Sequence, residues 1–301
     1  MACCVLAAGC VLDWDRTWDQ GATADLAADA KRDGKAPDGR GDRGADAVVT
    51  PSGWATSLGA TVTAIGYDVA VDTSNNVFVT GSFREELRSG AIKLKTRGKL
   101  DIFVAKLSSV GKVQWIVSGG GSDDDRGSAV VVAPEGGVYV SGFFVGSLTL
   151  GGKKHSGVGR DLFLARILAD GTVDWVKTYG GAGWDSCEAM ALDKPGDTLW
   201  LSGKFNGTIN LGGKKLTSTG PKFDLYVARF SAKDGTIQKA LRAGGPGYDV
   251  PTAVKLDGSG GAYLSGYFDG ASLTVGTTTL TGKGGFDIFV ARVLTSGDGF
   301  Q

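Results

Sequence analysis

The stretch TLWLSGKFNGTINLGGKKLTSTGPKFDLYVARF, residues 198–230, decides the fold because both of its ends recur along the chain. An aspartate opens a similar apolar run in four places: DIFVAKL from Asp101, DLFLARI from Asp161, DLYVARF from Asp224 and DIFVARV from Asp287. A glycine keeps step with it in VTGSF, VSGFF, LSGKF and LSGYF, at Gly81, Gly142, Gly203 and Gly266. Two markers that share a period of 60 to 63 residues indicate a tandem structural repeat.

Each copy of the repeat predicts four short strands. In the third copy they cover residues 189–193, 198–205, 224–230 and 237–243. Between residues 54 and 301 the apolar residues lack helical spacing, and the short apolar runs end at glycine or Asn/Asp turns. Four antiparallel strands joined by tight turns form one blade of a β-propeller. The predicted fold is therefore an all-β propeller of four four-stranded blades.

The two ends of the repeat region are complementary. Trp54 leads a lone strand of the fourth type, in line with Trp115 and Trp175, and all three side chains are expected to pack between blades. The chain ends where a fourth strand would follow residues 287–293. Pairing the Trp54 strand with the strand 287–293 would close the ring and remove exposed sheet edges. We expect this closure within a monomer; two chains that form one eight-bladed ring are the alternative.

The composition excludes electrostatic capture of nucleic acid or of an acidic membrane surface. The 301 residues carry a formal net charge of +0, with a pI of about 6.6. The 50 glycines sit at fixed phases of the repeat, where turns and bulges need their conformational freedom. Cys187 stands alone in the repeats and is expected to be a small, partly buried apolar residue and not a reactive thiol.

The first fifty residues differ from the rest. Residues 1–10 end in Ala-Ala-Gly-Cys10, which resembles a bacterial lipobox with Cys10 as the lipidated residue. The apolar run is too short to span a bilayer, and a trimmed ordinary signal peptide or an apolar end without meaning are the alternatives. Residues 11–50, rich in Asp, Ala and Gly, are expected to form a disordered tether to a propeller at 51–301. An exported, lipid-anchored protein of the bacterial cell envelope or surface is therefore expected.

Several markers hold one register through the repeats. GGAGWD at 180–185 and GGPGYD at 244–249 each precede an apolar strand, then a G-x-F strand end and the D-[IL]-[FY] strand. Together they resemble the SBBP-type β-propeller repeat of bacterial cell-surface proteins and lipoproteins, over residues 52–301. The resemblance implies a propeller at the cell surface and supplies no common catalytic residues.

The loops that enter each blade carry the candidate site. The candidate ligand-binding residues are Asp123, Asp124, Asp125, Arg126, Trp184, Asp185, Tyr248 and Asp249. Trp184 and Tyr248 are expected to be exposed for ligand stacking, and the first copy has lost the motif at residues 59–64. Glycine carbonyls beside Asp125, Asp185 and Asp249 suit calcium, and no other cofactor is expected. The alternative is that each Asp accepts backbone N–H groups within its own turn.

The sequence favours a protein without enzymatic activity. His155 is the sole histidine, and no nucleophile elbow or phosphate loop is present in a suitable context. We expect a surface-anchored binding or scaffolding module that contacts an envelope or extracellular protein or glycan through the loop face. The alternatives are a carbohydrate-active hydrolase or lyase that uses the loop carboxylates, and a mainly structural envelope component.

Overall fold

The computed structural model describes residues 53–294. The described chain is all-β, with 66% of its residues in strands and no helix. None of its segments is therefore a helix of the length and apolarity needed to cross a membrane. The predicted leader, the tether and Cys10 lie outside the described residues.

The strands form four successive antiparallel units with one strand order. Unit 1 contains β2 (Thr63–Val71), β3 (Val77–Arg84), β6 (Asp101–Leu107) and β7 (Val113–Gly120); unit 2 contains β8 (Arg126–Val132), β9 (Val138–Leu150), β10 (Lys153–Ile167) and β11 (Val173–Tyr179); unit 3 contains β12 (Ser186–Leu192), β13 (Thr198–Phe205), β16 (Asp224–Ser231) and β17 (Ile237–Ala243); unit 4 contains β18 (Asp249–Leu256), β19 (Ala262–Asp269) and β22 (Phe286–Val293). The four strands predicted in the third copy are confirmed within a few residues.

A short hairpin projects between the second and third strands of each unit. The hairpins are β4 (Glu86–Ser89) with β5 (Ile92–Lys95), β14 (Thr208–Leu211) with β15 (Lys214–Thr217), and β20 (Ser272–Val275) with β21 (Thr278–Thr281); in unit 2 the outer parts of β9 and β10 pair in the same way. The sequence predicted four strands per copy and none in this segment. Gly212 and Gly213 have φ values of 63° and 98°, as a two-residue hairpin turn requires.

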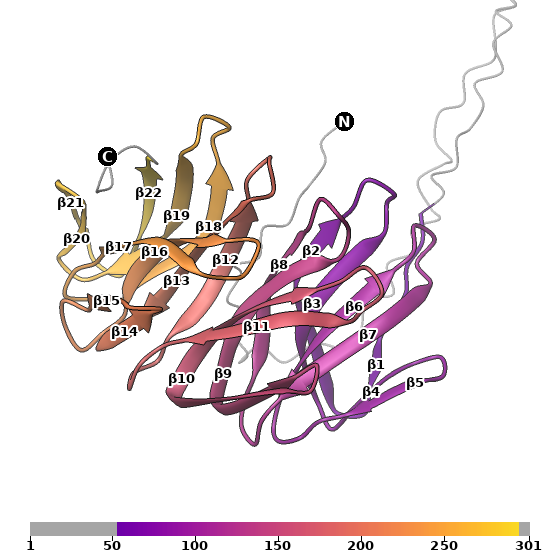
Figure 1. Ribbon diagram of the computed structural model, residues 1–301. Helices are drawn as coiled ribbons and strands as arrows, with labels where there is room; N and C mark the ends of the chain where they lie inside the picture. Colours follow the sequence, from indigo (N-terminus) through magenta and orange to yellow (C-terminus); the bar gives the residue numbers. More distant parts are fainter. Residues whose placement is uncertain (1–52, 295–301) are drawn as a thin grey trace, which may run out of the picture.

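Successive units pack face to face through apolar cores. The first strands β2, β8, β12 and β18 follow one another in chain order through the middle of the molecule (Figure 1). Phe78 and Ile102 of unit 1 share one core with Phe144 of unit 2, and two further cores join units 2 to 3 and 3 to 4. These shared cores fix how each unit is placed on the next.

Of the three tryptophans predicted to pack between units, Trp115 and Trp175 do so, whereas Trp54 lies against unit 1 alone and is 45% exposed. Trp54 covers Gly111 of unit 1 and donates its indole N–H to the Ser109 carbonyl at 2.8 Å. Trp115 of unit 1 repeats this on unit 2, where it covers Gly171 and donates to Ala169 at 3.0 Å. After Trp54, the two-residue strand β1 (Gly59–Ala60) pairs with β4. The segment that begins at Trp54 is therefore fastened to unit 1.

The predicted ring closure is not formed within residues 53–294. In this range β22 pairs with β19, and the Trp54 segment does not extend the sheet of unit 4. Ile288 and Val290 on β22 are 83% and 69% exposed. The packed cores set the placement of successive units, and this placement leaves the outer face of unit 4 uncovered.

Candidate functional site

A backbone hydrogen bond joins neighbouring units at each of the three interior junctions. The amide of the loop aspartate donates to the residue that precedes the strand-opening aspartate of the unit before it. These bonds are Asp125 to Leu100 at 2.9 Å, Asp185 to Arg160 at 2.7 Å, and Asp249 to Phe223 at 2.8 Å. As a result, two conspicuous aspartates of the sequence meet at each junction, one from each unit.

The paired carboxyls are Asp101 with Asp125, Asp161 with Asp185, and Asp224 with Asp249, and all six residues are at most 5% exposed. The first glycine of the motif fits against them. A Cβ on Gly120 would lie 2.6 Å from an Asp101 oxygen and 2.7 Å from an Asp125 oxygen, closer than real Cβ atoms come. The candidate ligand residues Asp125, Asp185 and Asp249 are therefore buried between units and not displayed on a loop surface.

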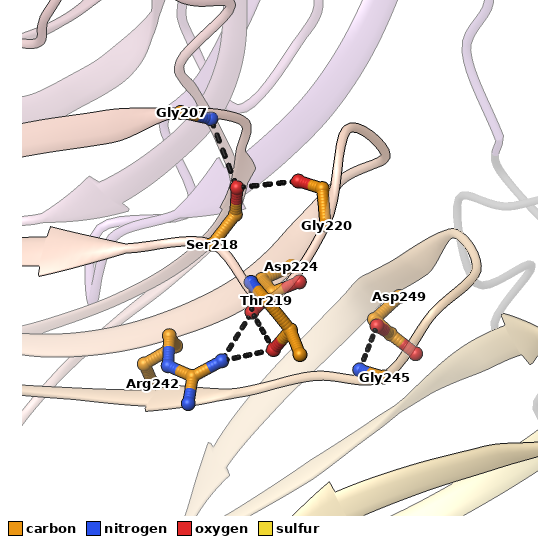
Figure 2. Close-up of polar contacts among 8 residues, drawn as sticks. All are labelled: Gly207, Ser218, Thr219, Gly220, Asp224, Arg242, Gly245 and Asp249. Atoms are coloured by element: carbon orange, nitrogen blue, oxygen red, sulfur yellow. Dashed lines mark hydrogen bonds and ion pairs between the residues drawn. The ribbon is translucent and has the colours of Figure 1, made fainter.

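Backbone N–H groups hold two of the three loop aspartates within their own turns, as the sequence alternative stated. Gly121 donates to Asp125 at 2.6 Å, and Gly245 donates to Asp249 at 2.7 Å. Beside Asp249, the Asp224 carboxylate accepts from Arg242 at 2.6 Å (Figure 2). The third junction is therefore compensated by a guanidinium.

The junction between units 2 and 3 lacks this compensation. Both carboxyl oxygens of Asp185 and one oxygen of Asp161 are buried without a hydrogen-bond partner. Burial, followed by the neighbouring Asp161 carboxylate, raises the pKa of Asp185 to about 8. Burial also raises the pKa of Asp161 to about 6. This pair therefore holds a proton at neutral pH.

The other two loop aspartates are also hard to ionise. Burial raises the pKa of Asp125 and of Asp249 to about 7, and the strand aspartate next to each adds to the effect. No group of three or more acidic, histidine or cysteine side chains suited to a metal occurs among residues 53–294. Calcium commonly takes six to eight oxygen ligands, and calcium binding here stays a prediction.

Arginine and aromatic side chains alternate across units 1 to 3. Stacked in order are Tyr67, Arg126, Phe143, Arg160 and Trp184, which we call the cationic–aromatic row. The guanidinium of Arg126 lies 4.7 Å from the Tyr67 ring centre and 5.0 Å from that of Phe143. That of Arg160 lies 4.0 Å from Phe143 and 4.3 Å from Trp184. Contacts of this kind stabilise by about 0.5–2 kcal/mol each, so the row is held in place.

Glu188 on β12 neutralises part of the positive charge of the row. Its carboxylate binds Arg126 at 3.0 Å and Lys204 at 3.1 Å, and it accepts from the Ser186 hydroxyl at 2.8 Å. Burial alone would raise the pKa of Glu188, but Lys204 and Arg126 outweigh burial and lower it. Arg126, a candidate ligand residue, thus also links unit 2 to unit 3.

The predicted aromatic residues differ in exposure. Trp184 is 54% exposed, as expected, and one face of its indole rests on Arg160. Tyr248 is half-buried, because its ring packs 5.7 Å from that of Phe223 and its hydroxyl accepts from Lys222 at 3.1 Å. The expectation that both are exposed is therefore correct for Trp184 alone.

The other two candidate residues lie at the first junction. Asp123 forms an ion pair with Lys99 at 2.9 Å, and Asp124 is half-buried in a backbone bridge to Leu100. Leu100 occupies the position that Arg160 takes in unit 2. Arg160 was not among the residues predicted from the sequence. The residue directly before the strand-opening aspartate differs between the copies, and such variation is typical of a site that is specific to one unit.

A cavity of about 510 Å³ opens at the junction between units 2 and 3. Asp161, Tyr179 and Asn210 supply polar groups to its wall, together with the glycine backbone of residues 180–181. Asp161 thus faces the cavity, and Arg160, the residue before it, belongs to the cationic–aromatic row. The junction between units 2 and 3 combines an exposed indole, a cavity and an uncompensated carboxyl pair.

Comparison with known proteins gives distant similarities. No family model matches the chain. The chain is 26% identical over 260 residues to the regulatory protein FlaEY of Caulobacter vibrioides, covering 80% of this chain and 27% of FlaEY. It thus spans about a quarter of that relative's length. A crystal structure of a protein of unknown function from Bacteroides caccae aligns with 67% of this chain and 70% of that one, with a TM-score of 0.28 and 9% identity.

Proposed function

We propose that the four units are blades of a β-propeller similar to the SBBP type, and that the protein is a non-enzymatic binding or scaffolding module. The shared strand order of the units supports the first part. The exposed Trp184 indole, backed by Arg160, is the observation that carries the second part. The partner is a protein or glycan of the cell envelope or the extracellular space.

The cationic–aromatic row suits a ligand that stacks on a flat apolar surface. Arg160 covers one face of Trp184, which pre-positions the indole and lowers the entropy lost on binding. The open face can accept a sugar ring or a planar side chain, and Glu188 limits the net positive charge behind it. Such a surface binds by contact area and has no need of a reactive group.

Substitution of Trp184 by alanine tests this function. We expect binding to oligosaccharides on a printed glycan array, or to peptides on a peptide array, to fall about tenfold or more, while the melting temperature falls by no more than about 4 °C because only the exposed contact with Arg160 is lost. The matched control is Val110→Ala, because Val110 is 75% exposed on a turn of unit 1 and lies outside the row. Undiminished binding by the Trp184 variant would overturn the proposal.

We place the module at the bacterial surface through a lipid on Cys10, because of the lipobox-like end of residues 1–10. The test is mass spectrometry of the chain expressed in a bacterial host, with Cys10→Ser as the control. A diacylglyceryl mass on Cys10 is expected in the parent chain. An unmodified or fully removed Cys10 in the exported protein contradicts the anchor.

A second candidate function, hydrolysis or elimination on a glycan, is favoured by the cavity beside Asp161. A carboxyl with a pKa of about 6 is in the range of general acids, and one of its oxygens has no partner. The test is release of reducing ends from bacterial polysaccharides by the parent chain and by Asp161→Asn. Equal rates in both would exclude a catalytic role for this carboxyl.

A further inference from the structure

The outer face of unit 4 is an interior surface without its cover. Tyr263 corresponds in register to Phe78, Tyr139 and Trp200, which the following unit buries to 0–3% exposure. Tyr263 itself is 47% exposed. Ile288 and Val290 correspond to Ile102 and Val104 of unit 1, which are 0% exposed. We call the face with Tyr263, Phe286, Ile288 and Val290 the tail face.

On the opposite face of unit 1 the first strand is uncovered in the same sense, whereas Phe103 and Ala105 on β6 are buried there with Leu58 and Ala60 packed against them. Val69 corresponds to Val130, Met190 and Val254, which the preceding unit buries to 2–8% exposure. Val69 is 58% exposed, and Val71 is 57% exposed. We call the face with Val69 and Val71 the head face.

Head and tail faces are the two halves of one junction. Each interior junction joins the tail-type face of one unit to the head-type face of the next, and it does so three times in this chain. The Trp54 segment supplies the missing piece. Trp54 contacts unit 1 as Trp115 contacts unit 2, yet Trp115 belongs to the fourth strand of the preceding unit. The segment, in which residues 53–58 form no strand, therefore occupies the place that the fourth strand of a preceding unit would take.

We propose that the tail face and the β22 edge bind the head face and Trp54 segment of a second copy of this chain. The contact joins two different surfaces, so it has to close into a ring or continue as a filament. Two copies that exchange both contacts form a closed ring of eight units. The head face, the tail face and the free edge of β22 are then covered in both copies.

A second copy fits better than the chain's own other end. Three buried cores fix the placement of successive units, and this placement leaves head and tail faces of one chain uncovered. Self-closure would tighten every junction and strain cores that contain fully buried side chains such as Phe144 and Leu201. A second copy completes both faces without any such change.

The register between the third and fourth strands within a unit predicts which residues meet. In unit 1, Val104 on β6 lies opposite Val117 on β7, two residues after Trp115. The same register places Val290 opposite Thr56, two residues after Trp54. Cross-strand neighbours have Cβ atoms about 4.5–5.5 Å apart, close enough for an engineered disulfide after small adjustment.

Disulfide trapping distinguishes the second copy from self-closure. Full-length chain with Thr56→Cys and Val290→Cys is oxidised in a background where Cys3, Cys4 and Cys10 are serine; Cys187 is fully buried and stays. We expect a covalent dimer on non-reducing gels. A disulfide confined to single chains, or no disulfide, overturns the proposal. Thr56→Cys with Val158→Cys on unit 2 is the control and should not cross-link.

Solution mass gives a second readout. Light scattering of the parent chain should give twice the chain mass, whereas a monomer or a species larger than two chains overturns the proposal. Val69→Asp on the head face and Ile288→Asp on the tail face should each give folded monomers, because both residues are exposed in one copy. A mixture of these two variants retains one intact head–tail pair and should form a dimer, and its failure to do so counts against the proposal.

Discussion

The buried carboxyl pair between units 2 and 3 makes stability depend on pH in a direction opposite to ordinary acid denaturation. Burial raises the pKa of Asp185 from 3.8 to about 8. Between these values the folded state keeps a proton that the unfolded state has released. The free energy of unfolding therefore falls as pH rises through this window. Outside the window Asp185 adds no further pH dependence, and above it the cost of the ionised carboxylate remains.

Asp185→Asn removes this dependence, because the carboxamide resembles the protonated acid at every pH. One pKa unit corresponds to about 1.4 kcal/mol, so ionised Asp185 costs the folded state at most about 6 kcal/mol. Entry of water at the junction relieves part of this cost, and we expect the variant to gain roughly 2–4 kcal/mol at pH 9. At pH 5 the gain should be smaller, at most about 1.7 kcal/mol, because only the interval between the unfolded pKa of 3.8 and pH 5 contributes there.

Urea unfolding followed by circular dichroism at pH 5 and pH 9 measures both values. The matched control is Asp287→Asn, because Asp287 occupies the strand-opening position at the tail face and has no loop aspartate beside it among the described residues. The Asp287→Asn variant should change the free energy of unfolding by the same amount at pH 5 and at pH 9. Loss of stability by the Asp185 variant at both pH values would refute the account of the pair as a proton-holding site.

Two further predictions concern the same part of the molecule. Gly180→Ala should destabilise the protein by at least about 2 kcal/mol in thermal unfolding, because the added Cβ would overlap the Asp161 carboxyl. Gly59→Ala, at the corresponding position of the first copy, is the control. It should cost below about 1 kcal/mol, because the atom nearest to its Cβ is 3.8 Å away. Arg126→Met should lower the free energy of unfolding by roughly 1–3 kcal/mol at pH 7 and by less at pH 3. Glu188 has a lowered pKa, so the stability it contributes is present above its unfolded pKa and is lost as pH falls; equal costs at both pH values would contradict this ion pair.

The period and the strands could be predicted from sequence because backbone geometry demands particular residues at fixed positions. The strand predicted at residues 198–205 is observed with those limits, and Cys187, which was expected to be partly buried, is fully buried. The hairpins between second and third strands were missed. Their signal was present, since Gly212-Gly213 stands between two short alternating runs, the pattern of a two-residue β-turn.

The candidate site was harder to predict because its members meet across units. Nothing local to Asp185 indicates that Asp161, more than twenty residues earlier, will lie against it in a buried junction. The sequence analysis therefore interpreted the loop aspartates as surface groups. Likewise, Arg160 joins Phe143 to Trp184 by cation–π contacts from a neighbouring unit, which a reading of one copy at a time does not reveal.

The Trp54 segment has a consequence for how such a chain can change length. The Trp54 indole binds unit 1 from the place that the fourth strand of a preceding unit would take. The described chain therefore begins part-way through a packed unit and not at the boundary between two units. An in-register duplication or deletion of one period of 60 to 63 residues would keep the same head and tail faces wherever it occurred. Unequal recombination could therefore alter the circumference of the assembly in single steps, without the need for a new contact surface to evolve.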